Sequence, residues 1–326
     1  MNQKRECGVL LPVSSLPSKY GIGCFSKSAY DFVDALKEAG QCCWQILPLG
    51  PTSYGDSPYQ SFSTFAGNPY FISLEDLIEE GVLTKKECDS ADFGKNKTSI
   101  DYAKIYKSRT SLLRKAYERS KISENPDFVE FQQKEGWWLK DYALFMAVKE
   151  RFDGEPWSEW AEDIRFRWQN ALDYYRRELY FDIEFQEYVQ FKFYEQWKKL
   201  KAYANKKGIR IIGDIPIYVA MDSADTWASP WLFKLDEKNQ PTQVAGCPPD
   251  GFSATGQLWG NPLYNWEVHR QSGFDWWIKR IEHCFSMYDI VRIDHFRGFD
   301  EYYAIPFGDK TAENGWWEKG PGMDLF

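Results

Sequence analysis

The sequence predicts an α/β fold of the parallel (β/α)8, or TIM-barrel, type, with about the first four strands lying within these 326 residues. Three observations support this prediction. A helical segment followed by a short turn and an apolar strand occurs three times. Each strand ends in a loop rich in polar and aromatic residues, as in barrels whose active sites lie at the C-terminal ends of the strands. No Gly-rich phosphate loop follows any strand, which argues against the alternative of an open doubly wound sheet that binds a nucleotide.

The first strand–helix–strand unit covers residues 7–49. Residues 7–17 form an apolar run that ends in Ser and Pro, which indicates a buried strand leading into a loop. Residues 28–39 show a helical apolar stripe, and Ser28 with Asp31 resembles a capping box at its start. The apolar residues 41–49 follow as the second strand, at a spacing typical of a βαβ unit.

Residues 50–70 form a loop with more than turn-forming residues. Hydroxyls, a carboxylate, an amide and aromatic faces are crowded together in it, and a purely structural loop does not need them. Such groups are what a polyol ligand requires, so we predict that this loop binds substrate. We assign residues 1–74 to the start of the barrel. The candidate binding residues are Tyr54, Asp56, Ser57, Tyr59 and Gln60.

Residues 75–185 differ in character, because charge is dense there and Gly is scarce. Apolar residues recur at helical spacing, for example in DYAKIYKSRTSLLRKAYERSK and WWLKDYALFMAVKERF. We predict a helical insertion subdomain between barrel strands, flanking the cleft. We assign its tryptophans to packing rather than chemistry, namely Trp137, Trp138, Trp157 and Trp160.

The barrel is predicted to continue in residues 186–326. The third strand covers residues 209–220, and Asp214 interrupts its apolar pattern. A turn cap is expected at a strand's end, whereas apolar residues flank Asp214 on both sides. This position favours a carboxylate that points inward near the barrel mouth. The strand follows a helix at 186–207 whose apolar face consists of Val189, Phe193, Trp197 and Leu200.

Residues 221–265 are predicted to be a long connection without clear secondary structure. Its many aromatic residues argue against disorder. A Pro–Pro–Asp–Gly turn presents Phe252, and Gln257 and Trp259 follow closely. We therefore predict that residues 245–262 form a lid or a subsite wall.

The fourth strand begins at residue 288 and is predicted to be buried. Because side chains alternate along a strand, Val291 and Ile293 share one face, while Arg292 and Asp294 share the other. The strand thus delivers a carboxylate beside a cation, with His295 next to it, at its C-terminal end. Alternatively, Asp294 caps the following helix and Arg292 is its structural partner. The preceding helix, at 274–285, has apolar residues at four-residue steps, Trp277, Ile281 and Phe285.

Composition excludes several classes of function. The net charge of -8 and the pI near 5.2 argue against a nucleic-acid or anionic-membrane surface. No signal peptide or membrane span is recognisable, and seven scattered cysteines predict reduced thiols in the cytoplasm. Only three histidines occur, and ligand-type residues are not clustered, so we expect no metal and no cofactor. Aromatic residues make up 18% of the chain, and most of them are expected to pack the core while a few contact sugar.

Six long motifs resemble one family, the amylomaltases, which are 4-α-glucanotransferases of the α-amylase clan. The resemblance runs nearly end to end and implies a retaining transfer reaction on maltooligosaccharides and α-1,4-glucans. It does not imply an oligomeric state. The motifs are LLPVSSLPSKYGIG, WQILPLGPTSYGDSPYQSFSTFAGNPY, GDIPIYVA, PPDGFSATGQLWGNPLY, VRIDHFRG and NGWWEKGPGMDLF.

The resemblance also implies residue roles. Asp294 would be the nucleophile that forms a covalent glycosyl-enzyme, and Arg292 would keep it ionised. His295 would bind sugar hydroxyls, and Asp214 would support the site from the neighbouring strand. The loop that lines donor sugars would include Tyr54, Asp56, Ser57 and Tyr59, and the loop over the cleft would include Phe252, Gln257 and Trp259.

One departure from the family is large. A retaining mechanism needs a second carboxylate as acid/base, roughly 5–5.5 Å from the nucleophile. In the family that Glu follows the point where this sequence stops, and the later acidic residues Glu301, Glu313 and Glu318 do not match it. The chain therefore resembles the N-terminal part of an amylomaltase, with two unpaired outer strands. We expect it to be inactive alone; the alternatives are a non-catalytic glucan-binding fragment and an α-glucan hydrolase of the same clan.

Overall fold

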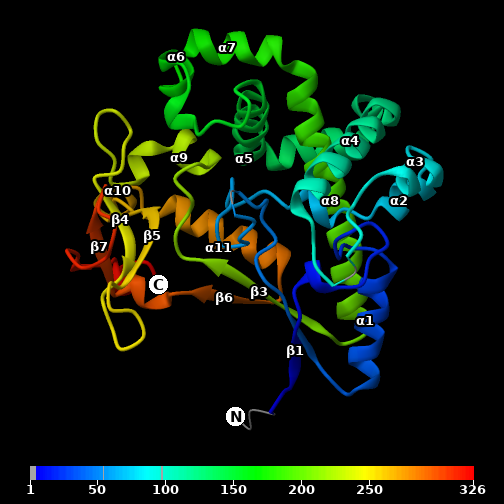
Figure 1. Cartoon of the computed structure of the whole chain (residues 1–326), viewed down its shortest axis with the longest axis horizontal. Coiled ribbons are helices and arrows are strands. Elements are labelled where there is room, and N and C mark those ends of the chain that lie inside the picture. Colours follow the sequence, from blue (N-terminus) through cyan, green and yellow to red (C-terminus); the bar gives the residue numbers. More distant parts are fainter. Residues whose placement is uncertain (1–4, 54, 97) are drawn as a thin grey trace.

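A computed structural model describes residues 5–53, 55–96 and 98–326 of the chain (Figure 1). A four-stranded parallel sheet in the order β1-β2-β3-β6 forms its base, which confirms the predicted α/β class. In the ladder between the last two strands, Asp214 lies opposite Arg292 and Pro216 opposite Asp294. The strands are β1 (Gly8–Leu10), β2 (Cys43–Gln45), β3 (Arg210–Pro216) and β6 (Ile290–Asp294).

A helix precedes each of the last three strands of this sheet: α1 (Lys27–Glu38), α8 (Tyr180–Lys206) and α11 (Asp275–Met287). Their apolar faces and the strands share one large core, because an amphipathic helix must bury its apolar stripe. The face predicted for α8 is confirmed, since all four of its residues are buried: Val189, Phe193, Trp197 and Leu200.

Three local expectations are wrong. Helix α1 starts after Ser26, which makes no side-chain capping bond, and Asp31 pairs with Lys27 instead of completing a capping box with Ser28. Strands β1 and β6 are exposed or half-buried rather than buried, since among the described residues each is an outer strand. On α11, Phe285 is exposed, because the buried face turns through Trp277, Arg280, Cys284 and Met287.

Residues 75–185 contain helices and no strand in the part that the structure describes, and α8 runs on without a break past residue 185. Three of the four tryptophans assigned to packing are buried, whereas Trp137 is 46% exposed. In Figure 1 the longer helices of this region stand above the parallel sheet. The helices are α2 (Leu74–Glu79), α3 (Lys85–Ser90), α4 (Tyr102–Ser120), α5 (Pro126–Arg151), α6 (Glu162–Arg165) and α7 (Gln169–Glu178).

Two buried glutamines of α8 fix the end of the substrate loop (residues 50–70) and the start of the segment that follows it. The Gln190 amide accepts from the Gly67 N–H at 2.7 Å and donates to the Gly67 carbonyl at 2.9 Å. Gln196 makes the same pair of bonds with Ser73, at 2.6 and 3.3 Å. Each amide thereby replaces the backbone partner that a strand would supply, so the buried segment keeps its hydrogen bonds.

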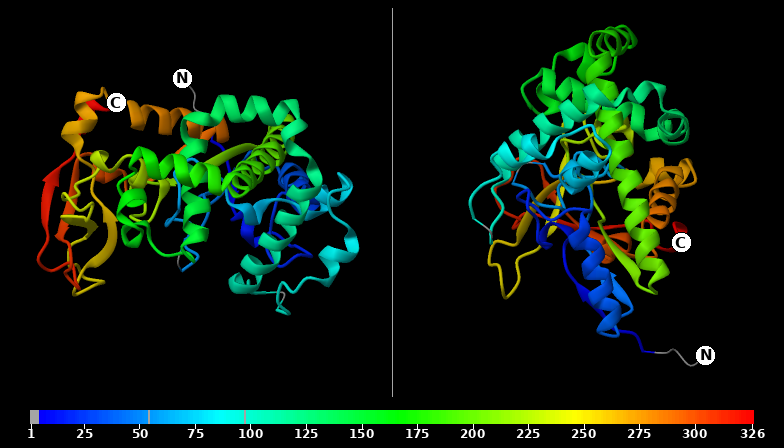
Figure 2. Two further views of the ribbon diagram at one scale, coloured as in Figure 1. Left: turned by 90° about the horizontal axis from the view of Figure 1, so that it is seen from above. Right: turned by 90° about the vertical axis from the view of Figure 1, so that its right-hand side faces the viewer.

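A second sheet, antiparallel and in the order β5-β4-β7-β8, lies at the opposite end of the molecule from α1–α4 (Figure 2, red and yellow). The prediction that residues 221–265 lack secondary structure is therefore wrong. The sheet escapes sequence reading because β4 pairs with β7, about sixty residues further along the chain. The elements are α9 (Ala224–Ala228), β4 (Gln243–Cys247), β5 (Gln257–Pro262), α10 (Trp266–Gln271), β7 (Glu301–Pro306) and β8 (Trp316–Lys319).

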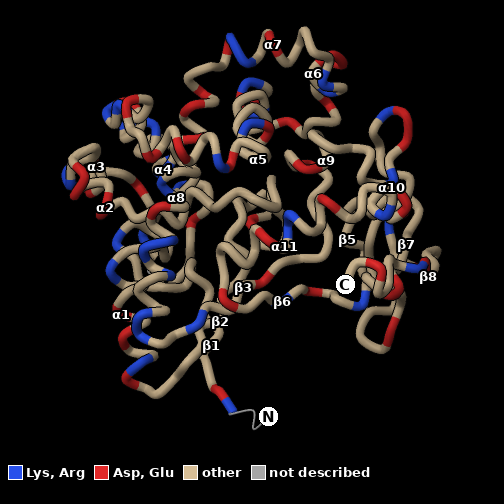
Figure 3. The backbone as a smooth tube through the Cα atoms, turned by 180° about the vertical axis from the view of Figure 1, so that it is seen from behind, with Lys and Arg blue, Asp and Glu red and all other residues tan. Residues whose placement is uncertain are grey.

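Charged residues of both signs are interspersed along the outer helices (Figure 3). Among the described residues, no helix combines the length and the apolar character needed to cross a membrane.

Candidate active site

Three charged side chains meet on one face of the parallel sheet, where β3 and β6 run side by side. Arg292 Nη1 donates to Asp214 Oδ1 at 2.6 Å, and Nη2 donates to Asp294 Oδ1, also at 2.6 Å. Val291 and Ile293 pack on the core from the other face, as the alternation of strand side chains requires. The predicted pairing of Arg292 with Asp294 on one face is therefore confirmed. We call Asp214, Arg292 and Asp294 the charged triad.

The two carboxylates of the charged triad differ in accessibility. The Asp214 side chain is 1% exposed, whereas that of Asp294 is 42% exposed. Asp214 also accepts a hydrogen bond from the Tyr59 hydroxyl at 2.7 Å, so both of its oxygens are occupied. Burial is the main cause that raises the pKa of Tyr59 to about 12, and its hydrogen bond to Asp214 is the second cause. The hydrogen bond from Arg292 to Asp214 is the main cause that raises the pKa of Arg292. Asp214 thus anchors the arginine, while Asp294 remains open to a reactant.

His295 follows the triad in a left-handed conformation, with φ of 54°. This conformation is uncommon outside glycine, and its cost is accepted mostly at functional sites. The imidazole packs edge-on against Trp259, with centroids 4.8 Å apart. Burial lowers the pKa of His295, which favours the neutral ring, and its buried Nε2 has no hydrogen-bond partner among the described residues. That nitrogen is available to a ligand hydroxyl.

Trp259 reaches His295 from the second sheet, so the two sheets meet at this contact. Gln257 and Trp259 lie on strand β5 rather than in a loop, and the Trp259 indole donates to Gln257 Oε1 at 3.0 Å. The expected presentation of Phe252 is confirmed, since its side chain is fully exposed in the turn between β4 and β5. Asp250 Oδ1 holds that turn by accepting from the Phe252 N–H at 2.8 Å.

The substrate loop divides between two places. Tyr59 joins the triad through Asp214, and Ser57 Oγ accepts from the Tyr59 N–H at 3.3 Å. Asp56 instead lines a separate cavity of about 690 Å³, together with Tyr70 and Tyr102, and burial raises its pKa. Tyr54 lies outside the described residues.

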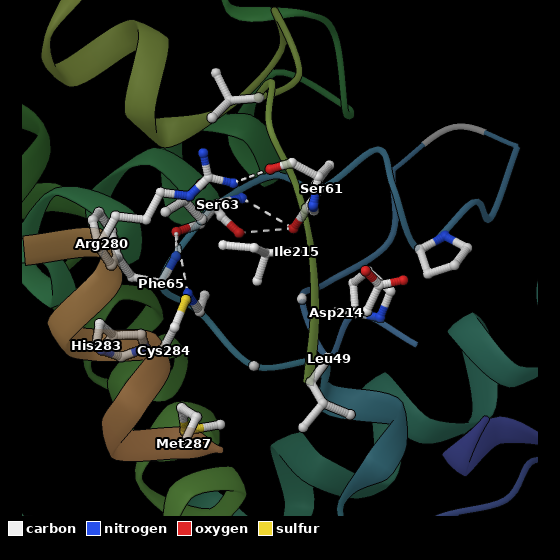
Figure 4. A pocket seen from close by; sticks show the side chains of 18 of the residues that line it. Leu49, Ser61, Ser63, Phe65, Asp214, Ile215, Arg280, His283, Cys284 and Met287 are labelled. Atoms are coloured by element: carbon white, nitrogen blue, oxygen red, sulfur yellow. Dashed lines mark hydrogen bonds between the residues drawn. The ribbon is translucent and has the colours of Figure 1, made fainter. Parts of the chain in front are cut away.

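Sequence reasoning missed Arg280, a 2% exposed residue on the apolar face of α11. Its guanidinium donates to the carbonyls of Pro216 and Ile217, the former a short contact and the latter at 2.8 Å, and to the Tyr264 hydroxyl at 3.1 Å. Because Pro216 lies opposite Asp294, these bonds fix the strand end beside the triad. Figure 4 shows Arg280 and Asp214 lining one small cavity, of about 60 Å³. The sequence did contain a signal for this residue, because Arg280 falls at helical spacing between Trp277 and Cys284, on the face of α11 that is buried.

Potential metal ligands gather elsewhere in the described part of the chain. The ligand atoms of Glu6, Cys42 and Cys43 lie within 4.8 Å of one another. They are at the start of the parallel strands, whereas the triad is at their C-terminal ends, and Glu6 already pairs with Arg210. The absence of a metal or cofactor remains a prediction.

Comparison with known proteins identifies relatives of this arrangement. The family model described as 4-alpha-glucanotransferase matches residues 11–326. The 4-alpha-glucanotransferases of Clostridium butyricum and Streptococcus pneumoniae serotype 4 are 52% and 53% identical over 96% and 99% of this chain. The chain spans 65% of the length of each.

The amylomaltase from Streptococcus agalactiae, solved in complex with acarbose, superposes with a TM-score of 0.96 at 47% identity, covering 99% of this chain and 66% of that one. The Corynebacterium glutamicum amylomaltase, with a TM-score of 0.76 and 22% identity over 96% of this chain and 44% of its own, shares the fold.

Proposed function

Since this chain belongs to the 4-alpha-glucanotransferase family, we propose that its protein transfers α-1,4-glucan segments between maltooligosaccharides. The observation that carries the proposal is the charged triad, in which a buried Asp214 aims Arg292 at an accessible Asp294. We further propose a cytoplasmic location, because all seven cysteines are free thiols.

The parallel sheet represents, in this proposal, the first four strands of a (β/α)8 barrel with residues 75–185 as a helical insertion. Three features support it. All four strands are parallel, a helix precedes each of the last three, and the charged side chains lie at the C-terminal end of the sheet. The outer strands β1 and β6 each have one strand partner among the described residues, as the two edges of an unclosed barrel wall would.

The chemistry assigned to the triad is a double displacement. Asp294 attacks the anomeric carbon of the donor, the glycosidic bond breaks, and the leaving oxygen takes a proton from an acid. The hydroxyl of an acceptor sugar then attacks the same carbon, its proton passes to the conjugate base of that acid, and the bond to Asp294 breaks. Arg292 orients the Asp294 carboxylate by donating a hydrogen bond to its Oδ1, and the unpaired Nε2 of His295 binds a sugar hydroxyl.

Three carboxylates of the two sheets, Asp214, Glu301 and Glu318, are engaged in other contacts, which supports the proposal that this chain alone does not turn over. Both oxygens of the buried Asp214 are engaged, by Arg292 and Tyr59. On the second sheet, Glu301 pairs with Lys319, and Glu318 accepts from Lys234 and Tyr302. The chain would therefore bind donor glucan and present the nucleophile without completing the cycle.

An activated donor tests nucleophilic attack by Asp294 separately from turnover. In α-maltosyl fluoride the leaving fluoride needs no acid, so attack by Asp294 alone breaks the C–F bond. We expect intact-mass spectrometry of the purified chain to show an added maltosyl group, which Asp294→Asn abolishes and the exposed control Asp300→Asn retains. An adduct that survives in Asp294→Asn contradicts the assigned nucleophile.

Maltotriose tests turnover and distinguishes the remaining candidates. We expect no products from the wild-type chain, with maltodextrin still bound. A ladder of longer maltodextrins plus glucose would mean that an acid/base lies within residues 1–326. Glucose and maltose without a ladder would indicate the alternative hydrolase. If Asp294→Asn loses both the maltosyl adduct and maltodextrin binding, the role of Asp294 is structural.

A further inference from the structure

A groove that no member of the charged triad lines carries four tryptophans, of which Trp138 is buried and the other three are at least partly exposed. It is a cavity of about 280 Å³ between α5, the 3-10 turn Pro230–Leu232, and the start of α11. We propose that this tryptophan groove, formed by Trp137, Trp231 and Trp276, is a second binding site for one or two glucosyl units of an α-glucan. The ligand class rests on the proposed function, but the site itself is independent of Asp294.

The indole rings of the tryptophan groove are open to a ligand. Trp231 is 59% exposed and Trp137 is 46% exposed, although large aromatic side chains normally bury their surface. Among the described residues, no ring stacks in parallel on either of them, and none of the three indole N–H groups takes part in a hydrogen bond. Flat apolar faces with a free donor at the edge suit a sugar ring, which has apolar C–H faces and a rim of hydroxyls.

The groove is held in shape from beneath. Phe65 is buried and packs edge-on against Trp137, at 4.7 Å between centroids, and against Trp276 at 6.1 Å. The Arg280 guanidinium lies 5.5 Å from the centroid of the Trp276 ring. Two of the three rings are therefore positioned before a ligand arrives, which lowers the entropic cost of binding.

A buried carboxylate supplies the polar part of the groove. Asp225 is 6% exposed, lines the cavity, and accepts a hydrogen bond from the Thr64 N–H to Oδ2 at 2.8 Å. Asp141 also lines the groove and pairs with Arg167 at 2.7 Å, so its charge is balanced. A carboxylate oxygen that borders a cavity can accept a hydrogen bond from a sugar hydroxyl.

Size and position agree with a second site. The volume lies just below the range of about 300–1,000 Å³ that small-molecule pockets occupy, which fits one or two sugar rings rather than a long chain. No member of the charged triad, and neither His295 nor Trp259, lines the groove. One long glucan molecule bound at both places would gain avidity from the second contact.

Affinity electrophoresis in native gels that contain amylopectin tests the proposal. The Trp259→Ala background removes the ring that packs on His295, which should weaken the binding proposed near the triad and make the contribution of the tryptophan groove easier to detect. In this background we expect Trp231→Ala and Trp137→Ala each to weaken binding about three- to ten-fold, as the loss of one aromatic contact predicts. Trp168→Ala is the matched control, because Trp168 is 50% exposed and lies outside the groove. Trp137→Phe should restore part of the binding.

The outcomes separate this site from the proposed function. If Trp231→Ala and Trp137→Ala leave the remaining retardation unchanged, the groove is not a glucan site, and the function proposed for the triad is unaffected. If Trp259→Ala alone abolishes all retardation, the groove binds no glucan and the same conclusion holds. If the wild-type chain is not retarded at all, both proposals are contradicted. Equal thermal unfolding midpoints for Trp231→Ala and wild type exclude misfolding as the cause of any loss.

Discussion

The two sheets of this molecule place functional groups by opposite means. The parallel sheet holds charges, and its key residue, Asp214, is 1% exposed and bound on both oxygens. The antiparallel sheet holds aromatic rings, and its turn leaves Phe252 entirely in solvent. Charged groups need fixed partners because an unpaired buried charge is very costly. Aromatic faces need only support from behind, so a β-hairpin is sufficient.

The largest expected effect on stability lies at Arg280 of α11, which holds the C-terminal end of β3. Arg280→Met leaves the carbonyls of Pro216 and Ile217 and the Tyr264 hydroxyl without this donor in a buried place. We expect the free energy of unfolding to fall by about 3–5 kcal/mol, measured by urea titration. Lys279→Met, one position earlier and exposed, should cost less than about 0.5 kcal/mol. A comparable loss in both variants would mean that α11 is merely sensitive to substitution.

Asp225, in the connection between the sheets, is a buried acidic group that should make the free energy of unfolding depend on pH. Burial raises its pKa from 3.8 to about 6, so the folded state binds a proton more tightly than the unfolded state. Its stabilisation is therefore present below about pH 4 and is lost as the pH rises through 6. A difference of about two pKa units corresponds to roughly 3 kcal/mol.

Asp225→Asn should remove this dependence, so that urea midpoints measured from pH 4 to 7 lose the descending slope that Asp225 contributes. Asp275→Asn is the control, since the Asp275 side chain is 61% exposed, and it should keep the wild-type profile. An unchanged slope in Asp225→Asn would assign the pH dependence to another group.

Charge on the antiparallel sheet should matter less. Glu318→Gln removes the charge that faces Lys234 but keeps an acceptor for the Tyr302 hydroxyl. Because both side chains of this ion pair are more than a fifth exposed, we expect a loss of only about 1 kcal/mol by urea titration. A loss as large as that of Arg280→Met would contradict the contrast between the sheets. Glu313→Gln, at an exposed turn, provides the baseline.

The smallest effect on stability is expected at Phe252. Phe252→Ala should change the free energy of unfolding by less than about 0.5 kcal/mol, because the ring makes no buried contact. Its effect should appear instead in maltodextrin affinity, measured by isothermal titration calorimetry. Unchanged affinity would remove Phe252 from the binding surface, and Phe307→Ala, at another exposed aromatic residue, is the control.

Local patterns in the sequence were enough to predict the parallel sheet and the contact between Arg292 and Asp294. Alternation along a short strand fixes which side chains share a face, and this does not depend on distant residues. The hydrogen bond from Tyr59 to Asp214 joins residues 155 positions apart, yet both were candidates on residue type alone.

The remaining features depend on contacts between distant segments. The pairing of β4 with β7, the anchoring of Pro216 by Arg280, and the turn of Asp56 toward a different cavity leave no periodic trace in one sequence. The sequence predicted that β1 and β6 are buried because both are apolar. Apolar composition does not show whether a strand lies at the centre or at the edge of a sheet, and these two lie at its edges.

The two glutamines of α8 have a consequence for the order in which the chain folds. Gln190 and Gln196 hold Gly67 and Ser73 across 123 residues each. Closing a loop of that length is slow and entropically costly, and contacts of large sequence separation form late. We therefore expect residues 67–73, at the end of the substrate loop and just after it, to remain unprotected in early hydrogen-exchange pulses until α8 docks. The geometry around Tyr59 would then be among the last parts of the molecule to reach its final form during refolding.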